Sequence, residues 1–214
     1  MLKIERFVCN PFQENCYVVS DDTQEAVVID CGAFFPEERK AVTEYIRTNG
    51  LSVKHLLATH AHIDHNFGND TMKEEFGLSP EVSAADMALM DRLREQAMQL
   101  ANIRLDYEMP AVGRFLSDGD VISFGSHRLI IIPTPGHSPG SVFFYCEEEH
   151  IAFSGDTLFN MSIGRTDFDF GSYRDIMTSL QRVARELPEE TVIYPGHGPK
   201  TTMQQEKQFN PYLR

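Results

Sequence analysis

The chain has 214 residues, of which 42% are hydrophobic and 24% charged, a composition typical of a folded globular protein. Its net charge of −13 argues against a general nucleic-acid-binding protein, which would carry a basic surface. No apolar run approaches the roughly 18 residues that a membrane span requires, so no membrane partner is expected. The length fits one domain, residues 1–214.

The amino-terminal segment and the cysteines predict the compartment. Residues 1–6 alternate apolar and charged side chains without the layout of a secretion signal, which favours the cytoplasm. The four cysteines, at positions 9, 16, 31 and 146, have neither Cys-x-x-Cys spacing nor a dense framework, so we expect free thiols. Cys16 and Cys31 lie at the ends of apolar strands and are expected to be buried.

The first half of the chain predicts strands over residues 3–9, 16–20, 26–30 and 54–59. A helix is expected to start at Pro36 and to end at Asn49-Gly50, and a shorter one should cover 66–76. A longer helix is predicted over 84–104, with methionine and leucine at helical spacing. That stripe is more typical of a core-facing surface, although it would also suit the wall of a substrate cleft.

The second half repeats this style, with strands predicted over residues 128–133, 141–146, 150–154 and 192–194 and a helix over 172–187. No low-complexity linker separates the halves. Blocks of strands, each followed by helices, favour two packed sheets with helices outside over a single doubly wound parallel sheet.

Residues 59–65 read Thr-His-Ala-His-Ile-Asp-His and follow an apolar run. They place four potential metal ligands within six positions. Imidazole and carboxylate donors together suit zinc and its first-row neighbours, and a carboxylate-containing set suits catalysis better than a structural clip. Without a metal, so many polar groups beside a buried strand would be costly. The predicted ligands are His60, His62, Asp64 and His65, whereas His55 is expected to be an ordinary strand histidine.

Three further donors each follow an apolar strand and lie in a glycine-containing turn. Glycine and proline fix the backbone of such turns, so that a short side chain points at one spot, and loops at strand ends are where ligands collect. The donors are His137 in Pro135-Gly-His-Ser-Pro-Gly140, Asp156 in Ser154-Gly-Asp-Thr157, and His197 in Pro195-Gly-His-Gly-Pro199.

Seven donors exceed the capacity of one four-coordinate ion, but two ions that share a carboxylate can use them all. We therefore predict two divalent ions, with zinc favoured and iron or manganese as alternatives. The predicted grouping is His60, His62 and His137 at one ion and Asp64, His65 and His197 at the other, with Asp156 bridging.

The order His-x-His-x-Asp-His, then separate His, Asp and His, resembles the metallo-β-lactamase superfamily, in its hydroxyacylglutathione hydrolase (glyoxalase II) branch. The resemblance covers nearly the whole chain and includes Ile163-Gly-Arg-Thr-Asp-Phe168 and Tyr194-Pro-Gly-His-Gly198. It implies an α/β (α+β) fold, a four-layer αβ/βα sandwich of two mixed sheets with helices on the outer faces.

The resemblance also implies an activity: a metal-bridging hydroxide attacks the thioester carbonyl of a glutathione adduct such as S-lactoylglutathione. Thiolate is a good leaving group that needs little acid assistance, and two ions can generate the hydroxide and stabilise the oxyanion. Asp64 and Asp156 are the expected catalytic residues, and Asp64 would also orient the nucleophile. The expected partner is a small-molecule thioester, and the protein is a monomer or a homo-oligomer.

Two features distinguish the chain from full-size glyoxalase II. It stops at Arg214, without the helical carboxy-terminal region that supplies glutathione contacts, so it resembles the short, single-domain bacterial proteins. It also has Arg165-Thr166-Asp167 where full-size enzymes tend to carry Lys-x-Tyr. Arg165 is a candidate substrate-binding residue because guanidinium can hold a carboxylate bidentately. A structural pair with Asp167 or Asp169 is the alternative.

Other functions are compatible with parts of the pattern. Persulfide dioxygenases resemble this chain but use one iron, which here would be held by His60, His137 and Asp156. A partner-binding protein with a vestigial site is disfavoured, because all seven donor positions are occupied. Lactamase activity is disfavoured by the lack of an export signal, and a nuclease by the acidic charge.

Overall fold

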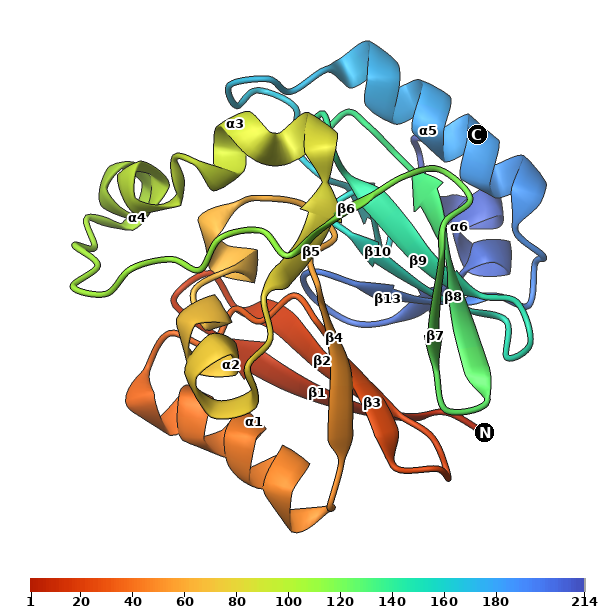
Figure 1. The fold of residues 1–214 in the computed structure, drawn as a ribbon. Helices are drawn as coiled ribbons and strands as arrows, with labels where there is room; N and C mark the ends of the chain where they lie inside the picture. Colours follow the sequence, from red (N-terminus) through yellow and green to blue (C-terminus); the bar gives the residue numbers. More distant parts are fainter. Residues whose placement is uncertain (214) are drawn as a thin grey trace.

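The computed structural model describes residues 1–213 and contains two six-stranded sheets that face each other (Figure 1). The first sheet has the strand order β1-β2-β3-β4-β5-β6. Its first three strands pair antiparallel, and its last four pair parallel. The strands are β1 (Lys3–Cys9), β2 (Glu14–Ser20), β3 (Glu25–Ile29), β4 (Ser52–Leu57), β5 (Pro80–Ser83) and β6 (Arg114–Leu116).

The second sheet has the order β14-β13-β10-β9-β8-β7 and is antiparallel except for the parallel pair β10–β13. A separate two-stranded sheet pairs β11 (Leu158–Phe159) with β12 (Ser162–Ile163). The strands of the second sheet are β7 (Val121–Phe124), β8 (His127–Pro133), β9 (Val142–Cys146), β10 (Ile151–Gly155), β13 (Val192–Pro195) and β14 (Thr201–Thr202).

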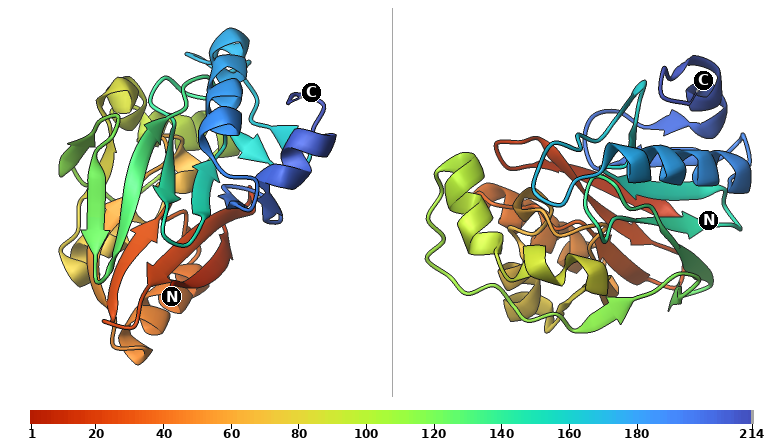
Figure 2. Two further views of the ribbon diagram at one scale, coloured as in Figure 1. Left: turned by 90° about the vertical axis from the view of Figure 1, so that its right-hand side faces the viewer. Right: turned by 90° about the horizontal axis from the view of Figure 1, so that it is seen from above.

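Helices cover the outer faces of both sheets (Figure 2). On the first sheet lie α1 (Pro36–Thr48) and α2 (Asn69–Phe76), and on the second lie α5 (Tyr173–Glu186) and α6 (Met203–Phe209). Two shorter helices, α3 (Met87–Met90) and α4 (Leu93–Ala101), follow β5, and 3-10 turns cover Ile63–His65 and Ala84–Asp86. The expected layering of two mixed sheets between outer helices is confirmed.

Side chains along the buried strands alternate between the two faces of each sheet, and this alternation explains the layers. In β9, Phe144 packs between the sheets, whereas its neighbours Phe143 and Tyr145 pack against α5. In β2, Val19 faces the second sheet and Val18 faces α1. Because successive side chains of a strand point to opposite faces, a central strand that is apolar throughout requires cover on both sides.

The predicted strands are all present, with small differences at their ends. The helices expected from Pro36 to Asn49-Gly50, over 66–76 and over 172–187 are present as Pro36–Thr48, Asn69–Phe76 and Tyr173–Glu186. The single helix expected over residues 84–104 is wrong, because α3 and α4 are separate. The carbonyl of Leu89, which Leu93 N–H would use in a continuous helix, accepts instead from Arg92 N–H at 3.0 Å and Gln96 Nε2 at 2.8 Å. Strands β5, β6, β7 and β14 and helix α6 were not predicted.

The cysteines of the chain are all buried and free, as expected. Within residues 1–213, no helix has the length and apolarity to span a membrane.

The core between the sheets predicts a stability test. Phe144 is fully buried there, and Phe144→Ala should lower the free energy of unfolding by about 3–5 kcal/mol, because it removes buried apolar surface and leaves a cavity. Phe115→Ala, at a position 49% exposed on β6, should cost less than about 1 kcal/mol. Urea denaturation of both variants measures the difference, and similar losses would contradict this assignment of the core.

Candidate metal centre

The seven predicted ligands lie in four loops that leave the two sheets at one edge. The His-rich loop follows β4 of the first sheet, and the other three loops follow β8, β10 and β13 of the second. These three strands run in the same direction, since β8 and β10 both pair antiparallel with β9 and β13 pairs parallel with β10. Their carboxyl ends therefore meet beside the end of β4.

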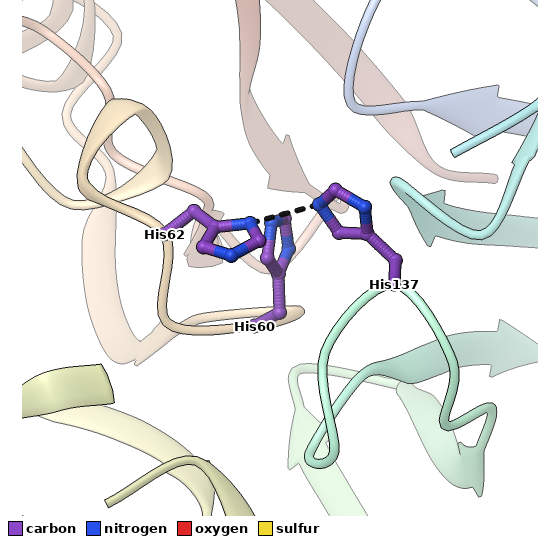
Figure 3. Close-up of side chains that lie close together, drawn as sticks. All are labelled: His60, His62 and His137. Carbon is purple, nitrogen blue, oxygen red and sulfur yellow. Dashed lines mark hydrogen bonds between the residues drawn. The ribbon is translucent and has the colours of Figure 1, made fainter. Parts of the chain in front are cut away.

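The first predicted group is assembled as expected. His60, His62 and His137 are buried, and one nitrogen from each lies within 4.8 Å of the others. Figure 3 shows the three rings pointing toward one another, with His60 and His62 on one loop and His137 on another. His62 Nδ1 and His137 Nε2 are 2.8 Å apart, so one of them donates to the other in this structure.

The second predicted group is also assembled. Donor atoms of Asp64, His65 and His197 lie within 4.8 Å of one another. Asp64 Oδ2 is 3.2 Å from His197 Nε2 and 3.6 Å from His65 Nε2. His65 is fully buried, whereas Asp64 and His197 are partly exposed on the side that opens to solvent.

Asp156 lies between the groups. Its Oδ2 is 3.5 Å from His137 Nε2, in the first group, and 3.5 Å from His197 Nε2, in the second. Its Oδ1 is 3.4 Å from His65 Nε2. This is the position that the predicted bridging role requires.

Three buried atoms of this cluster show whether its residues fit metal ions, because each of them lacks a partner within the protein. His60 Nε2, His65 Nε2 and Asp156 Oδ1 are buried without a hydrogen-bond partner among residues 1–213. Each such atom costs about 1–3 kcal/mol if nothing satisfies it. Donors of a tetrahedral zinc site with bonds of 2.0–2.1 Å lie about 3.3 Å apart, close to the separations of 3.2–3.6 Å around Asp64 and Asp156. The residues fit divalent metal ions.

The opposite ring nitrogens of four histidines each have a partner that fixes the ring. Metal-binding histidines typically hold the ring in this way, with the second nitrogen bonded to a carboxylate, carbonyl or hydroxyl. The Nδ1 contacts are His60 to Thr59 Oγ1 at 3.0 Å, His65 to Asp30 Oδ2 at 3.0 Å, His137 to the Arg165 carbonyl at 2.7 Å, and His197 to the Phe12 carbonyl at 3.1 Å.

The electrostatic setting differs between the two groups. Burial lowers the pKa of His62 to about 4 and holds the pKa of His60 well below its usual value, so both are neutral ligands near pH 7. Burial acts the same way on His65, but the carboxylates of Asp64 and Asp156 outweigh it and raise its pKa well above the usual value. Burial likewise raises the pKa of both carboxyl groups, and His65 more than reverses this, so that both remain ionised.

Several buried polar residues that the sequence did not single out hold these loops. Asp86 accepts from Ala61 N–H at 2.9 Å, Ser138 Oγ at 2.8 Å and Gly140 N–H at 2.6 Å, and thereby joins the His-rich loop to the loop of His137. Gln96 accepts from Ile63 N–H at 3.1 Å. Asp86 and Gln96 lie in a segment predicted as one amphipathic helix, so no sequence signal marked them.

Two acidic residues behind the second group were also missed. Asp30 accepts from Thr59 N–H and Thr59 Oγ1, both at 2.7 Å, as well as contacting His65. Glu14 is fully buried 3.9 Å from His65 Nδ1, and burial raises its pKa well above the usual value. Asp30 directly follows an apolar strand, as the predicted ligands do. This position is the sequence feature that would have identified it. We have no comparable signal for Glu14.

The centre lies at the bottom of a cavity of about 480 Å³. Among its lining residues are the predicted ligands His62, Asp64, His137, Asp156 and His197. The rest of the lining is mostly apolar and consists of Phe12, Leu100, Phe159, Ser162, Ile163, Arg165 and Phe168.

Arg165 lines this cavity, but its guanidinium is paired. Nε and Nη2 each lie 2.7 Å from a carboxylate oxygen of Asp167, and the guanidinium stacks on Phe168 at 3.9 Å. The structural pair weighed in the sequence is therefore present, and Nη1 is the part of the group that remains for a substrate.

Comparison with known proteins decides the family. The model of the metallo-beta-lactamase superfamily matches residues 9–197, which include all seven predicted ligands. The chain belongs to this superfamily. The resemblance inferred from the sequence is thereby confirmed, and so is the fold.

Relatives within the superfamily cover the whole chain. A hydroxyacylglutathione hydrolase, GloC, from Haemophilus influenzae is 34% identical over 99% of this chain and 98% of its own. The probable metallo-hydrolase YqgX of Bacillus subtilis is 33% identical over 99% and 98%. Together with the superfamily match, they support a metal-dependent hydrolase.

Solved structures agree with this assignment. The BLEG-1 B3 metallo-beta-lactamase has a TM-score of 0.87 at 32% identity, covering 100% of this chain and 99% of its own. TTHA1623, solved in a di-iron-bound form, has a TM-score of 0.85 at 34% identity, covering 98% and 100%. Divalent metal binding is a general property of this superfamily fold, in line with the donor clusters found here.

The geometry predicts the effect of removing a ligand. Asp156→Ala removes the carboxylate between the groups and should lower bound metal from two equivalents to one or fewer, because each ion loses a donor. His62→Ala should do the same at the first group. Elemental analysis of the purified variants measures this, and circular dichroism should show an unchanged fold.

The matched control is His150→Ala, because His150 is partly exposed and lies outside the donor clusters. It should keep two equivalents. Full metal content in both Asp156→Ala and His62→Ala would contradict the assignment.

Proposed function

We propose that this protein is a dinuclear metal-dependent thioesterase of the glyoxalase II type, which hydrolyses a thioester of glutathione or a similar thiol. The observation that carries the proposal is the pair of donor groups with Asp156 between them, at the bottom of one cavity. The whole-chain similarity to a hydroxyacylglutathione hydrolase supports this substrate class. We keep the cytoplasm as the predicted compartment.

The proposed ligands are those of the two clusters: His60, His62 and His137 for one ion, Asp64, His65 and His197 for the other, and Asp156 for both. The mixture of imidazole and carboxylate favours zinc, and iron is the alternative that the similarity to a di-iron structure supports. Two divalent ions held there would make water acidic enough to be the nucleophile near neutral pH and would polarise the thioester carbonyl.

Side chains of this chain would assist the other steps of the hydrolysis. Asp64 is ionised, lines the cavity and holds His197 Nε2 at 3.2 Å, so its carboxylate can orient a water molecule and accept its proton. Water adds its oxygen to the carbonyl carbon, the carbon–sulfur bond breaks, and the thiol part leaves as thiolate. No side chain needs to protonate the leaving sulfur during bond breaking, since thiolate is a weak base, with a conjugate-acid pKa of about 8.5, and therefore a good leaving group.

The walls of the cavity exclude bulk water from the reacting bond. Phe12, Phe159 and Phe168 line the cavity together with the proposed ligands. Apolar walls strengthen the interactions of the charged groups beneath them, because the local dielectric falls. Arg165 Nη1 lies at the same wall, where we propose that it contacts an uncharged oxygen of the acyl group.

A persulfide dioxygenase is the second candidate, with one iron on His60, His137 and Asp156. The fold of ETHE1 from Myxococcus xanthus is similar, with a TM-score of 0.78, but at 24% identity this concerns the fold alone. A one-iron site would leave the second group of donors unused, although His65 is fully buried there with an unsatisfied Nε2. The geometry therefore favours two metals and hydrolysis.

The proposal predicts that protein with two metal equivalents hydrolyses S-lactoylglutathione, with thiol release as the measurement. His62→Ala should lower kcat/KM by at least about 10³-fold, since it removes a metal ligand, while His150→Ala stays within about twofold.

Two parallel assays separate the alternatives. Oxygen uptake with glutathione persulfide would support the dioxygenase, and cleavage of a β-lactam without thioester cleavage would support a lactamase. Inactivity on S-lactoylglutathione after loading with zinc, iron or manganese would contradict the glutathione substrate assignment.

A further inference from the structure

His62 differs from the other predicted histidine ligands in how its ring is held. His60, His65, His137 and His197 each have a hydrogen-bond partner on Nδ1 that fixes the ring. His62 instead turns Nδ1 toward His137 Nε2, at 2.8 Å, and no hydrogen bond joins its Nε2 to another residue within 1–213 (Figure 3). Its direction is therefore set by the backbone that carries it and by packing against neighbouring rings.

One buried side chain, Gln96 of α4, binds the backbone on both sides of His62. Its Nε2 donates to the Ala61 carbonyl at 3.1 Å, in the peptide that precedes His62. Its Oε1 accepts from Ile63 N–H at 3.1 Å, in the peptide that follows His62. The other Nε2 hydrogen goes to the Leu89 carbonyl, at 2.8 Å. Both donors and the acceptor of the amide are thus in use, and all three bonds agree on one orientation of it.

The Ala61 N–H is held by the same part of the chain. Asp86, directly before α3, accepts from it at 2.9 Å and also accepts from Ser138 Oγ and Gly140 N–H, in the loop of His137. Asp86 occupies the N-cap position of α3, yet its side chain makes no capping bond to that helix. The segment of α3 and α4 therefore holds Ala61 by both of its backbone groups.

The buried face of α4 does not need an amide for packing. Gln96 is 7% exposed, and its neighbours Leu93 and Ala97 are buried in the same apolar cluster as Ile63. A buried amide costs free energy unless it is hydrogen-bonded, and the bonds of Gln96 go to the His-rich loop and to the Leu89 carbonyl before α4. Its polar character thus serves the loop that carries His62.

Loss of this amide would leave the Ala61 carbonyl and the Ile63 N–H without partners in a buried place. Such groups turn toward other partners or water, because an unsatisfied buried group is costly. Both peptides adjoin the backbone of His62, so their rotation redirects its ring. Metal ligands have to be held within about 0.5 Å of their working positions, so a small rotation is enough to weaken a metal site.

We propose that Gln96 is the positioning residue for His62 and, through His62, for the ion at His60, His62 and His137. The amide does through the backbone what direct partners on the ring do for the other four histidines. This role rests on the dinuclear centre of the proposed function and is independent of the thioester substrate. Gln96 has no hydrogen bond to the loops of Asp156 or His197, so the second ion should be affected little.

The test replaces the amide by a thioether of similar length, in Gln96→Met, and measures zinc binding by competition with a chelator. The dissociation constant for one of the two ions should rise about 10–100-fold, as is usual when a residue that orients a ligand is lost, and the other should change less than about threefold. Anomalous diffraction from crystals of the variant with limiting zinc should place the weaker peak at His60, His62 and His137.

The matched control is Gln99→Met, on the same helix. Gln99 is exposed and donates to Glu95 Oε1 at 2.8 Å, away from the ligand loops. Both zinc constants should stay within about twofold of those of the unmodified chain. Cobalt in place of zinc adds a spectroscopic readout, since its visible absorption follows the geometry of its ligands. The spectrum at saturating cobalt should change in Gln96→Met and stay the same in Gln99→Met.

Gln96→Glu is the conservative variant. It keeps the length and the acceptor for Ile63 N–H but, as a carboxylate, loses the donor for the Ala61 carbonyl, so it should weaken the same ion less than Gln96→Met. Urea denaturation of the metal-free variants measures whether they fold, and if Gln96→Met does not, Gln96→Glu takes its place in the same assays.

Unchanged zinc constants and cobalt spectra in a folded Gln96 variant, or equal weakening of both ions, would overturn the positioning role. Failure of the proposed function looks different, because the unmodified chain would then bind a single zinc ion or leave thioesters uncleaved. In either case weaker binding at His60, His62 and His137 in Gln96→Met supports the positioning role, and unchanged binding there overturns it.

Discussion

The proposed metal centre depends on the packing of the two sheets, because its proposed ligands come from both. His60, His62, Asp64 and His65 follow β4 of the first sheet, and the other three ligands follow strands of the second. The apolar core between the sheets therefore determines the separation of the donors, and the polar contacts of Asp86 and Asn15 join loops of the two sheets. Buried donors without partners lie at this edge, and bound ions would satisfy them.

Chemistry and specificity are supplied by different parts of the molecule. The ligands lie on short turns held by buried hydrogen bonds, as a centre with fixed donor separations requires. The surroundings of the cavity are built from exposed or half-buried residues such as Phe12, Leu100 and Arg165, whose charges and shapes can vary without disturbing the metals.

Much of the fold and the ligand set followed from the sequence, because period-two strands and glycine-bounded donors are local signals. All seven predicted ligands lie together, and the two predicted trios occur among the donor groups beside a third group of His60, His65 and Asp156; ligation itself stays a proposal. The break between α3 and α4 was not predictable, because it depends on Gln96 reaching back to the Leu89 carbonyl.

The central claim is that two ions share Asp156, and anomalous diffraction from crystals grown with zinc tests it most directly. Data collected at the zinc absorption edge should show two peaks about 3.5–4 Å apart. One peak should be bounded by His60, His62 and His137 and the other by Asp64, His65 and His197, with Asp156 in contact with both. A single peak under saturating zinc, or two peaks with Asp156 bound to neither, would contradict the account.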